Sequence, residues 1–130
     1  MNKLLWILLL ALFLGVPSWD HAQAADLVTA QKQFNKYCAK CHGAGGRGDG
    51  EQAATLRHKP KDWTNCAEMA TVSDEDRFKI TKFGGQQVHG QQCEMPGMGK
   101  ALSDDEIRGL VAFIRSFCQQ QPTAAKETLP

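Results

Sequence analysis

The sequence predicts an all-α protein built on three main helices. Apolar residues recur at steps of three and four in two stretches, one just before the first cysteine pair and one near the end of the chain. Two acidic clusters that begin at Ser73 and Ser103 are typical of helix starts. No segment alternates apolar and polar residues as a strand would, and a chain of 130 residues suggests one domain.

The first 24 residues have the pattern of a secretory signal peptide. Lys3 supplies a positive charge, residues 4–16 are almost all apolar, and Ala22-Gln23-Ala24 is a small-residue cleavage site. The apolar run is short for a transmembrane helix, and an uncleaved N-terminal anchor is the alternative. We therefore expect cleavage after residue 24 and an exported protein that is soluble afterwards, in the bacterial periplasm. Five cysteines suit such an oxidising compartment.

The first main helix is predicted from Asp26, as its cap, to about Tyr37. Its apolar face recurs at helical spacing in Leu27, Ala30, Phe34 and Tyr37, and Cys41 continues the series. The cysteine pair that follows is therefore expected at the end of an amphipathic helix.

Cys38-Ala39-Lys40-Cys41-His42 is a C-x-x-C-H motif, the signature of covalent haem attachment. Two thiols with two residues between them can each add to one haem vinyl group, and His42 then binds the iron as proximal ligand. A zinc site would need further cysteine or histidine pairs, and a thioredoxin-like dithiol would need a βαβ setting. A plain Cys38–Cys41 disulfide or a chance match would also give this pattern.

A glycine-rich loop and a basic loop follow the motif. Residues 43–50 hold too many glycines for a helix, and they lack the Gly-Lys-Ser/Thr of a phosphate-binding loop, so we expect a tight turn under the haem. Residues 53–56 suggest one short helical turn. In the basic loop, Arg57, Lys59 and the Trp63 indole are candidates to contact the haem propionates, and a solvated surface loop is the alternative.

The middle helix is predicted from Ser73, as its cap, to Phe83, where Gly84-Gly85 ends it. Phe78, with Ile80 or Phe83, supplies its apolar side. Residues 86–99 are then expected to form a polar loop that carries two methionines, Met95 and Met98.

The last helix begins at a capping box, Ser103-Asp104-Asp105-Glu106. Its apolar stripe consists of Ile107, Leu110, Val111, Ile114, Phe117 and Cys118. Gly109 inside it predicts a close crossing with another helix. Residues 119–130 are polar, contain two prolines, and are expected to be a flexible C-terminal tail.

Met95 is the predicted sixth ligand of the iron. The loop of residues 86–99 can cross the ring face opposite His42, and Pro96 restricts the backbone of Met95 and so helps to orient its side chain. Met98 carries the same sulfur between two glycines and is the first alternative. His89 and His58 are further candidates.

The balance of charged residues argues against nucleic-acid binding. The chain has 15 Lys and Arg against 14 Asp and Glu, a net charge of +1, which does not suit general nucleic-acid binding. The basic stretch from Arg57 to Lys61 is expected to steer a docking partner modestly.

The C-x-x-C-H motif and the Met-Pro pair before the last helix resemble those of the class I cytochrome c family, in particular small bacterial periplasmic monohaem cytochromes c. The matching residues are Cys38, Cys41, His42-Gly43, Gly48-Asp49-Gly50, the Ser73 helix with Gly84-Gly85, Met95-Pro96 and residues 102–107. The resemblance covers nearly all of residues 25–118. The family often has a proline soon after Gly-Asp-Gly, where this chain has Glu51 and then Pro60, so the resemblance does not identify the carbonyl that orients His42.

The resemblance implies the class I cytochrome c fold around one covalently attached haem c, with His42 and Met95 as iron ligands and no catalytic residues. It implies an electron carrier that docks transiently with redox protein partners near the haem edge. A dedicated electron-transfer subunit of a periplasmic dehydrogenase or oxidase is the alternative. Two further hypotheses are a haem enzyme or gas binder with an open sixth position, and a haemless disulfide-rich binding module.

Three cysteines, Cys66, Cys93 and Cys118, remain once the haem has taken two. They allow one intramolecular disulfide, and all three pairings are open by counting. The resemblance favours Cys66–Cys118, because related proteins often carry cysteines at these two places.

Overall fold

The computed structural model describes residues 19–90 and 93–119, and in this part of the chain it contains helices and no strand. The elements are α2 (Trp19–Tyr37), α3 (Ala39–His42), the 3-10 turn η1 (Ala53–Thr55), α4 (Cys66–Ala70), α5 (Asp74–Phe83), α6 (Gly85–His89) and α7 (Asp104–Gln119). The all-α prediction is confirmed, with α2, α5 and α7 as the three main helices. Residues 1–18 of the expected signal peptide and residues 120–130 of the expected tail lie outside the described residues.

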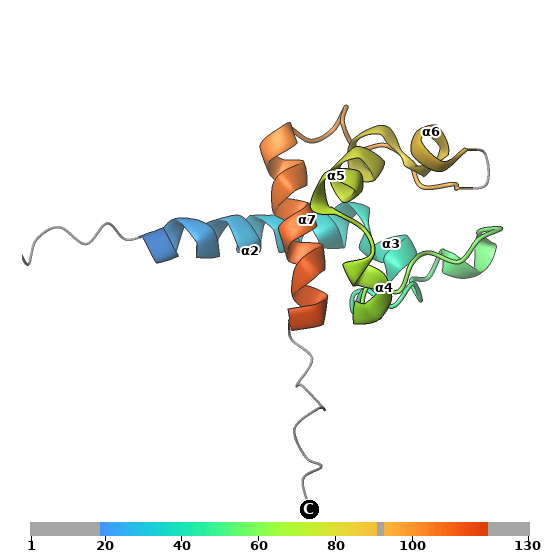
Figure 1. Cartoon of the computed structure of the whole chain (residues 1–130), viewed down its shortest axis with the longest axis horizontal. Coiled ribbons are helices and arrows are strands. Elements are labelled where there is room, and N and C mark those ends of the chain that lie inside the picture. The colour runs from blue at the N-terminus through green and yellow to red at the C-terminus, as the bar shows by residue number, and fades with distance from the viewer. Residues whose placement is uncertain (1–18, 91–92, 120–130) are drawn as a thin grey trace, which may run out of the picture.

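Helices α2 and α7 cross and form the centre of the molecule (Figure 1). Phe34 of α2 and Ile107 and Leu110 of α7 are fully buried at this crossing. Gln33 Nε2 also donates a hydrogen bond of 2.6 Å to Glu106 Oε1 across it. The last helix thus packs its predicted apolar stripe against the first.

The predicted start of the first helix is wrong. α2 begins at Trp19, so Asp26 lies inside the helix and is not its cap. The residues just before Asp26 are alanine and glutamine, which favour helix, and nothing there stops the helix from extending upstream. Leu27 is 41% exposed and is not part of the core, whereas Ala30 is buried as predicted.

An aromatic cluster extends the core towards the cysteine pair. Phe34 lies within 5.2 to 5.8 Å, between ring centroids, of Phe113, Phe117 and Trp63. Tilted aromatic pairs at this separation add to the stabilisation that burial supplies. Trp63 therefore links the loop that precedes α4 to both central helices.

Helix α5 begins as predicted, because the Ser73 side chain accepts a hydrogen bond from the Asp76 amide, and it ends at Gly84. Its apolar side agrees with the prediction for Phe78, which is buried, and for Ile80, which is half-buried, whereas the alternative Phe83 is 48% exposed. Thr81 and Arg77 are buried as well, which was not predicted. The charged side chain of Arg77 is thus buried, although its hydropathy would predict that it faces solvent.

Residues 85–89 form helix α6, so the prediction of a loop throughout residues 86–99 is wrong for its first part. Gly84 ends α5 and immediately begins α6, which has only five residues and no apolar period to reveal it. The following residues, 93–98, have no regular secondary structure and lead into a turn at 99–100, so this part is a loop as expected.

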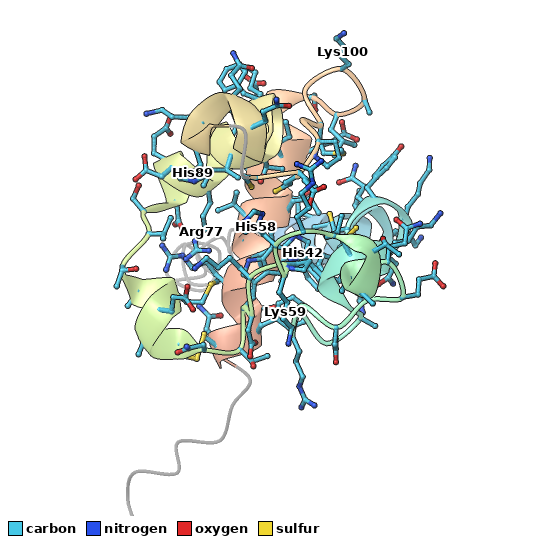
Figure 2. The ribbon with its side chains drawn as sticks, turned by 90° about the vertical axis from the view of Figure 1, so that its right-hand side faces the viewer. His42, His58, Lys59, Arg77, His89 and Lys100 are labelled. Atoms are coloured by element: carbon cyan, nitrogen blue, oxygen red, sulfur yellow. A yellow bond between two sulfur atoms is a disulfide. The ribbon has the colours of Figure 1, made fainter. Side chains whose placement is uncertain are left out.

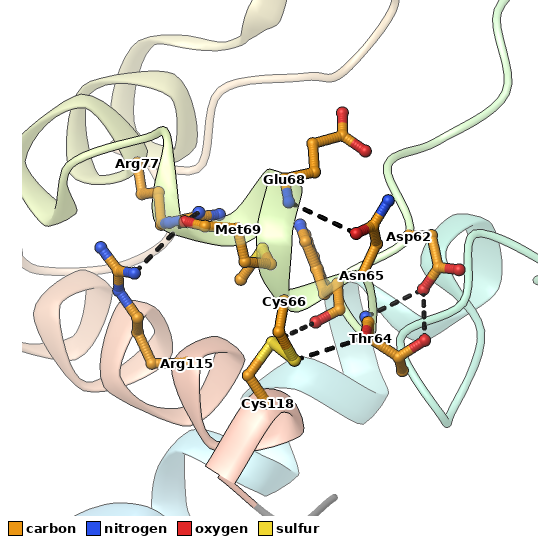
Figure 3. Close-up of a disulfide and its surroundings, with 10 residues drawn as sticks. Asp62, Thr64, Asn65, Cys66, Glu68, Met69, Arg77, Arg115 and Cys118 are labelled. Atoms are coloured by element: carbon orange, nitrogen blue, oxygen red, sulfur yellow. Dashed lines mark hydrogen bonds between the residues drawn. A yellow bond between two sulfur atoms is a disulfide. The ribbon is translucent and has the colours of Figure 1, made fainter. Parts of the chain in front are cut away.

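The short helix α4, which the sequence did not predict, is tied to the end of α7. Cys66 and Cys118 form a disulfide with a Cα–Cα distance of 5.4 Å, which confirms the expected pairing (Figure 3). Cys93 is outside any disulfide. Among residues 19–90 and 93–119, no helix has both the length and the apolar character needed to cross a membrane.

Candidate haem site

The cysteine pair lies on one short helical turn that follows α2. His42 and Cys41 donate their backbone N–H groups to the Cys38 carbonyl, at 2.9 and 3.2 Å. Side chains three and four apart lie on the same side of a helix, so the two sulfurs and the imidazole face one region. Both cysteines are half-buried and outside disulfides. Burial, with a smaller contribution from Cys41, raises the pKa of Cys38 to about 11, so this sulfur is a neutral thiol at neutral pH.

His42 is buried and held against an aromatic ring. Its imidazole stacks on Trp63, with ring centroids 3.9 Å apart and an interplanar angle of 10°. Burial lowers the pKa of His42 to about 4, against an opposing effect of the Lys61 backbone. The imidazole is therefore neutral at physiological pH, which is the form that binds a metal. Its Nδ1 atom is buried and has no hydrogen-bond partner in the described part of the chain.

The backbone of Pro60 and Lys61 runs beside the glycine-rich loop that follows His42. Gly48 has a φ of +71°, and a Cβ there would run into the Pro60 carbonyl oxygen. The Trp63 amide donates to the Gly46 carbonyl at 2.7 Å, which fixes the two segments together. The expected tight turn is confirmed, and Lys61 is the residue whose backbone lies close enough to influence the imidazole.

The three residues predicted to contact the propionates do not come together as a group. Arg57 and Lys59 are exposed, and the Arg57 amide donates to Glu94 at 2.7 Å. Trp63 is only 7% exposed, and its ring is occupied by the contact with His42. Their contact with the propionates stays a prediction.

Met95 lies in a segment that is pinned to the junction of α5 and α6. Its carbonyl accepts a hydrogen bond of 2.9 Å from the Gly85 amide. Gly84 has a φ of +92°, and a Cβ there would lie 3.0 Å from the Met95 carbonyl oxygen, so only glycine allows this close approach. The Met95 side chain is half-buried and does not join the core cluster.

Met98 has a different environment. Its amide donates to the Thr81 carbonyl at 2.8 Å, and its side chain packs against the core cluster that contains Leu102 and Ile107. These contacts suit a methionine with a packing role.

Figure 2 labels four side chains that project onto the same part of the view. His42, His58 and Arg77 are labelled near its centre, and His89 is labelled above them. His58 and His89 are exposed, while His42 and Arg77 are buried. Within residues 19–90 and 93–119, no group of three or more His, Cys, Asp or Glu side chains is placed to hold a metal ion, so the zinc alternative has no donor set there.

Arg77 is a buried charged residue whose burial the sequence did not predict. It lies on the buried face of α5, and the only signal in the sequence was a charged residue beside Phe78 in a helix with few apolar positions. Its burial depends on how α5 packs, which the sequence pattern alone does not give.

The residues present fit a covalently bound haem. The chain offers two thiols one helical turn apart, a buried neutral imidazole next to them, and a methionine held by its own backbone in a separate segment. Imidazole and thioether together are the axial ligand pair of cytochromes c.

Comparisons with known proteins identify chains that are similar to this one. The family model described as "Cytochrome C oxidase, cbb3-type, subunit III" matches residues 25–114. A cytochrome c6 of Gloeothece citriformis (strain PCC 7424) is 27% identical over 117 residues, which cover 88% of this chain and 93% of the relative.

Two solved structures share the fold. The KustC0563 c-type cytochrome superposes with a TM-score of 0.54 at 22% identity, over 68% of this chain and 95% of that one. The Kuenenia stuttgartiensis reducing HAO-like protein complex Kustc0457/Kustc0458 gives a TM-score of 0.57 at 27% identity, over 72% of this chain and 44% of that one. The chain therefore belongs to the cytochrome c family that the matching model describes, and it is a small class I c-type cytochrome with covalently bound haem c and the function of an electron carrier.

Proposed function

We propose that this cytochrome is a periplasmic shuttle that carries single electrons between redox proteins, with His42 and Met95 as the axial ligands of its haem iron. The observation that carries the ligand assignment is the backbone hydrogen bond from Gly85 to the Met95 carbonyl. It holds Met95 in place while leaving its side chain outside the core cluster. Met98, by contrast, is used in packing.

This ligand set explains why the protein carries electrons and does not transform a substrate. When both axial positions of haem iron are taken by protein side chains, no position is left for a substrate or a gas. A thioether ligand in an apolar setting favours the reduced iron and raises the potential. His42 contributes a neutral imidazole that its stacking on Trp63 holds in one plane.

Export to the periplasm is part of the same proposal. It rests on the signal-peptide pattern of residues 1–24 and on the Cys66–Cys118 disulfide, since disulfides persist in oxidising compartments. N-terminal sequencing of the protein from a periplasmic extract should begin at Ala25. A chain that retains Met1 and stays with the membrane would show that the segment is an anchor.

The ligand assignment is tested by two matched substitutions in the haem-loaded protein. Met95→Ala should let carbon monoxide bind the ferrous iron, lower the potential, and abolish the weak thioether-to-iron charge-transfer band of the ferric form. Met98→Ala should leave all three properties unchanged. The reverse result would assign Met98, and carbon monoxide binding by the unaltered protein would favour a haem enzyme or gas binder.

A second candidate function is that of a dedicated electron-transfer subunit. It is favoured by the family model, which is described as an oxidase subunit, and by the solved complex in which a similar domain makes up less than half of a longer chain. Size-exclusion chromatography of a native periplasmic extract separates the two. A shuttle elutes at the size of the single chain, and a subunit elutes with its enzyme.

A further inference from the structure

Arg77 is a buried cation whose charge is not balanced by the protein around it. Its side chain is only 8% exposed, although it lies on a helix of ten residues with solvent on its other side. Arg77 Nη2 donates a hydrogen bond of 2.6 Å to the Met69 carbonyl. Its Nε is buried and has no hydrogen-bond partner in the described part of the chain. Buried charges in proteins are paired, so this arrangement calls for an acceptor.

A second guanidinium makes the imbalance larger. Arg115 Nη1 approaches the same Met69 carbonyl at 3.3 Å, so two cations converge on one oxygen (Figure 3). Arg115 is satisfied, because it pairs with Asp74 and donates to the Val72 carbonyl at 2.9 Å. Arg77 forms no ion pair with a carboxylate in the described residues. Burial, and then the charge of Arg115, lower the pKa of Arg77, and Asp74 opposes this only in part.

The position of Arg77 suggests which anion it binds. Its neighbour Met69 belongs to the same buried cluster as Trp63, and Trp63 stacks on His42. In the view of Figure 2, Arg77 and His42 are both labelled near the centre of the molecule. Haem carries two carboxylates, and a guanidinium binds a carboxylate through two parallel N–H groups.

We propose that Arg77 is the residue that pairs with a haem propionate carboxylate through its unpartnered Nε and an adjacent N–H. Arg57 and Lys59, the candidates from the sequence, are exposed to water, which screens such a pair. Lys61 already pairs with Glu68. The proposal requires haem c but does not depend on whether Met95 or Met98 is the axial ligand.

The test compares Arg77→Gln with Arg57→Gln in the haem-loaded protein. Two properties are measured: the resonance Raman bending mode of the propionates, which responds to hydrogen bonds on the carboxylate, and the reduction potential. In Arg77→Gln the mode should shift and the potential should fall, because a nearby cation disfavours the ferric iron. Arg77→Lys, which keeps the charge but not the planar fork, should restore part of the potential and not the mode. Arg57→Gln should change neither.

An unchanged propionate mode in a folded Arg77→Gln protein would overturn the proposal, as would a shift produced by Arg57→Gln in its place. If Arg77→Gln fails to accumulate with haem, the structure of the unaltered haem-loaded protein gives the answer. A carboxylate oxygen of the haem within about 3 Å of Arg77 Nε supports the proposal. A protein carboxylate or an inorganic anion at that atom contradicts it, and so does ordered water alone.

Discussion

Two glycines of this chain differ in whether the structure requires glycine at that position. Gly48 has a positive φ and lies against the Pro60 carbonyl, so a side chain there would both strain the backbone and push the two segments apart. Gly109 lies inside α7, where a Cβ would meet only the Ala30 Cβ, at 3.8 Å. This is ordinary van der Waals contact. The predicted helix crossing is real, but it does not require glycine.

Gly109→Ala should therefore stabilise the protein by about 0.5–1 kcal/mol, because alanine loses less conformational freedom than glycine when a helix forms. Thermal unfolding followed by circular dichroism measures the change. Gly48→Ala is the matched control and should destabilise. A lower melting temperature for Gly109→Ala would mean that α2 and α7 approach more closely than the Ala30 contact indicates.

At the residue scale, the sequence was a better guide to the residues of the haem-attachment motif than to the burial of the side chains around them. Cys38, Cys41 and His42 were assigned by a motif whose spacing reflects the chemistry directly. The burial of Arg77 was missed because its hydrogen-bond acceptor, the Met69 carbonyl, and the nearby charge of Arg115 belong to other elements. Hydropathy alone would have placed Arg77 in solvent.

At the scale of elements, helices with caps or long apolar stripes were predictable and short ones were not. The Ser103 box forms as expected: the Ser103 amide donates to Glu106 Oε2 at 2.8 Å, and the Glu106 amide donates to Ser103 Oγ at 3.3 Å. Helices α4 and α6 have five residues each, fewer than two turns, so they carry no period that a sequence could show. Tertiary contacts fix them instead: the Cys66–Cys118 disulfide for α4, and the hydrogen bond from Gly85 to the Met95 carbonyl for α6.

The capping box makes stability depend on pH. Hydrogen bonds from the Ser103 amide, then from its hydroxyl, and then from Gln33 lower the pKa of Glu106. A carboxylate whose pKa is lower in the folded state stabilises above its unfolded pKa, and this contribution is lost as the pH falls through the folded value. Glu106→Gln should therefore be less stable than the unaltered protein at neutral pH, and the difference should vanish in acid.

Denaturant unfolding at a series of pH values measures that difference. Asp105→Asn changes a carboxylate in the same turn that does not bond to Ser103, so it serves as the control. A stability difference for Glu106→Gln that stays constant down to strongly acid pH would show that the carboxylate charge has no part in the cap.

At the scale of the whole molecule, the disulfide closes a long loop of the chain. Cys66 and Cys118 are 52 residues apart, and their bond ties α4 to the end of α7. Replacing both with serine should cost about 3–4 kcal/mol in the chain-entropy model. Denaturant unfolding monitored by circular dichroism measures this, and Cys93→Ser should have little effect. An equal loss in Cys93→Ser would point to a different pairing.

Surface charge should influence association with partners. Arg57 and Lys59 are exposed in the loop before α4, as the sequence predicted for a docking stretch. Electron transfer to an acidic partner, or to an anionic metal complex as its substitute, should slow several-fold as salt increases. Replacing both residues with glutamine should weaken that dependence. Rates that do not respond to ionic strength would rule out this stretch as a docking patch.

The attachment of residues 93–99 to α5 and α6 has a consequence for motion. The amides of Gly85, Met98 and Gly99 donate across this junction, to the carbonyls of Met95, Thr81 and Lys82. None of these backbone bonds involves α2 or the aromatic cluster, so the segment can open as a local unit, with loss of the Met98 packing on the core, while the central crossing stays folded. In hydrogen-exchange measurements, these three amides should exchange together and faster than those of α7. With Met95 as the proposed ligand, the iron would then lose its thioether while the rest of the protein stays folded.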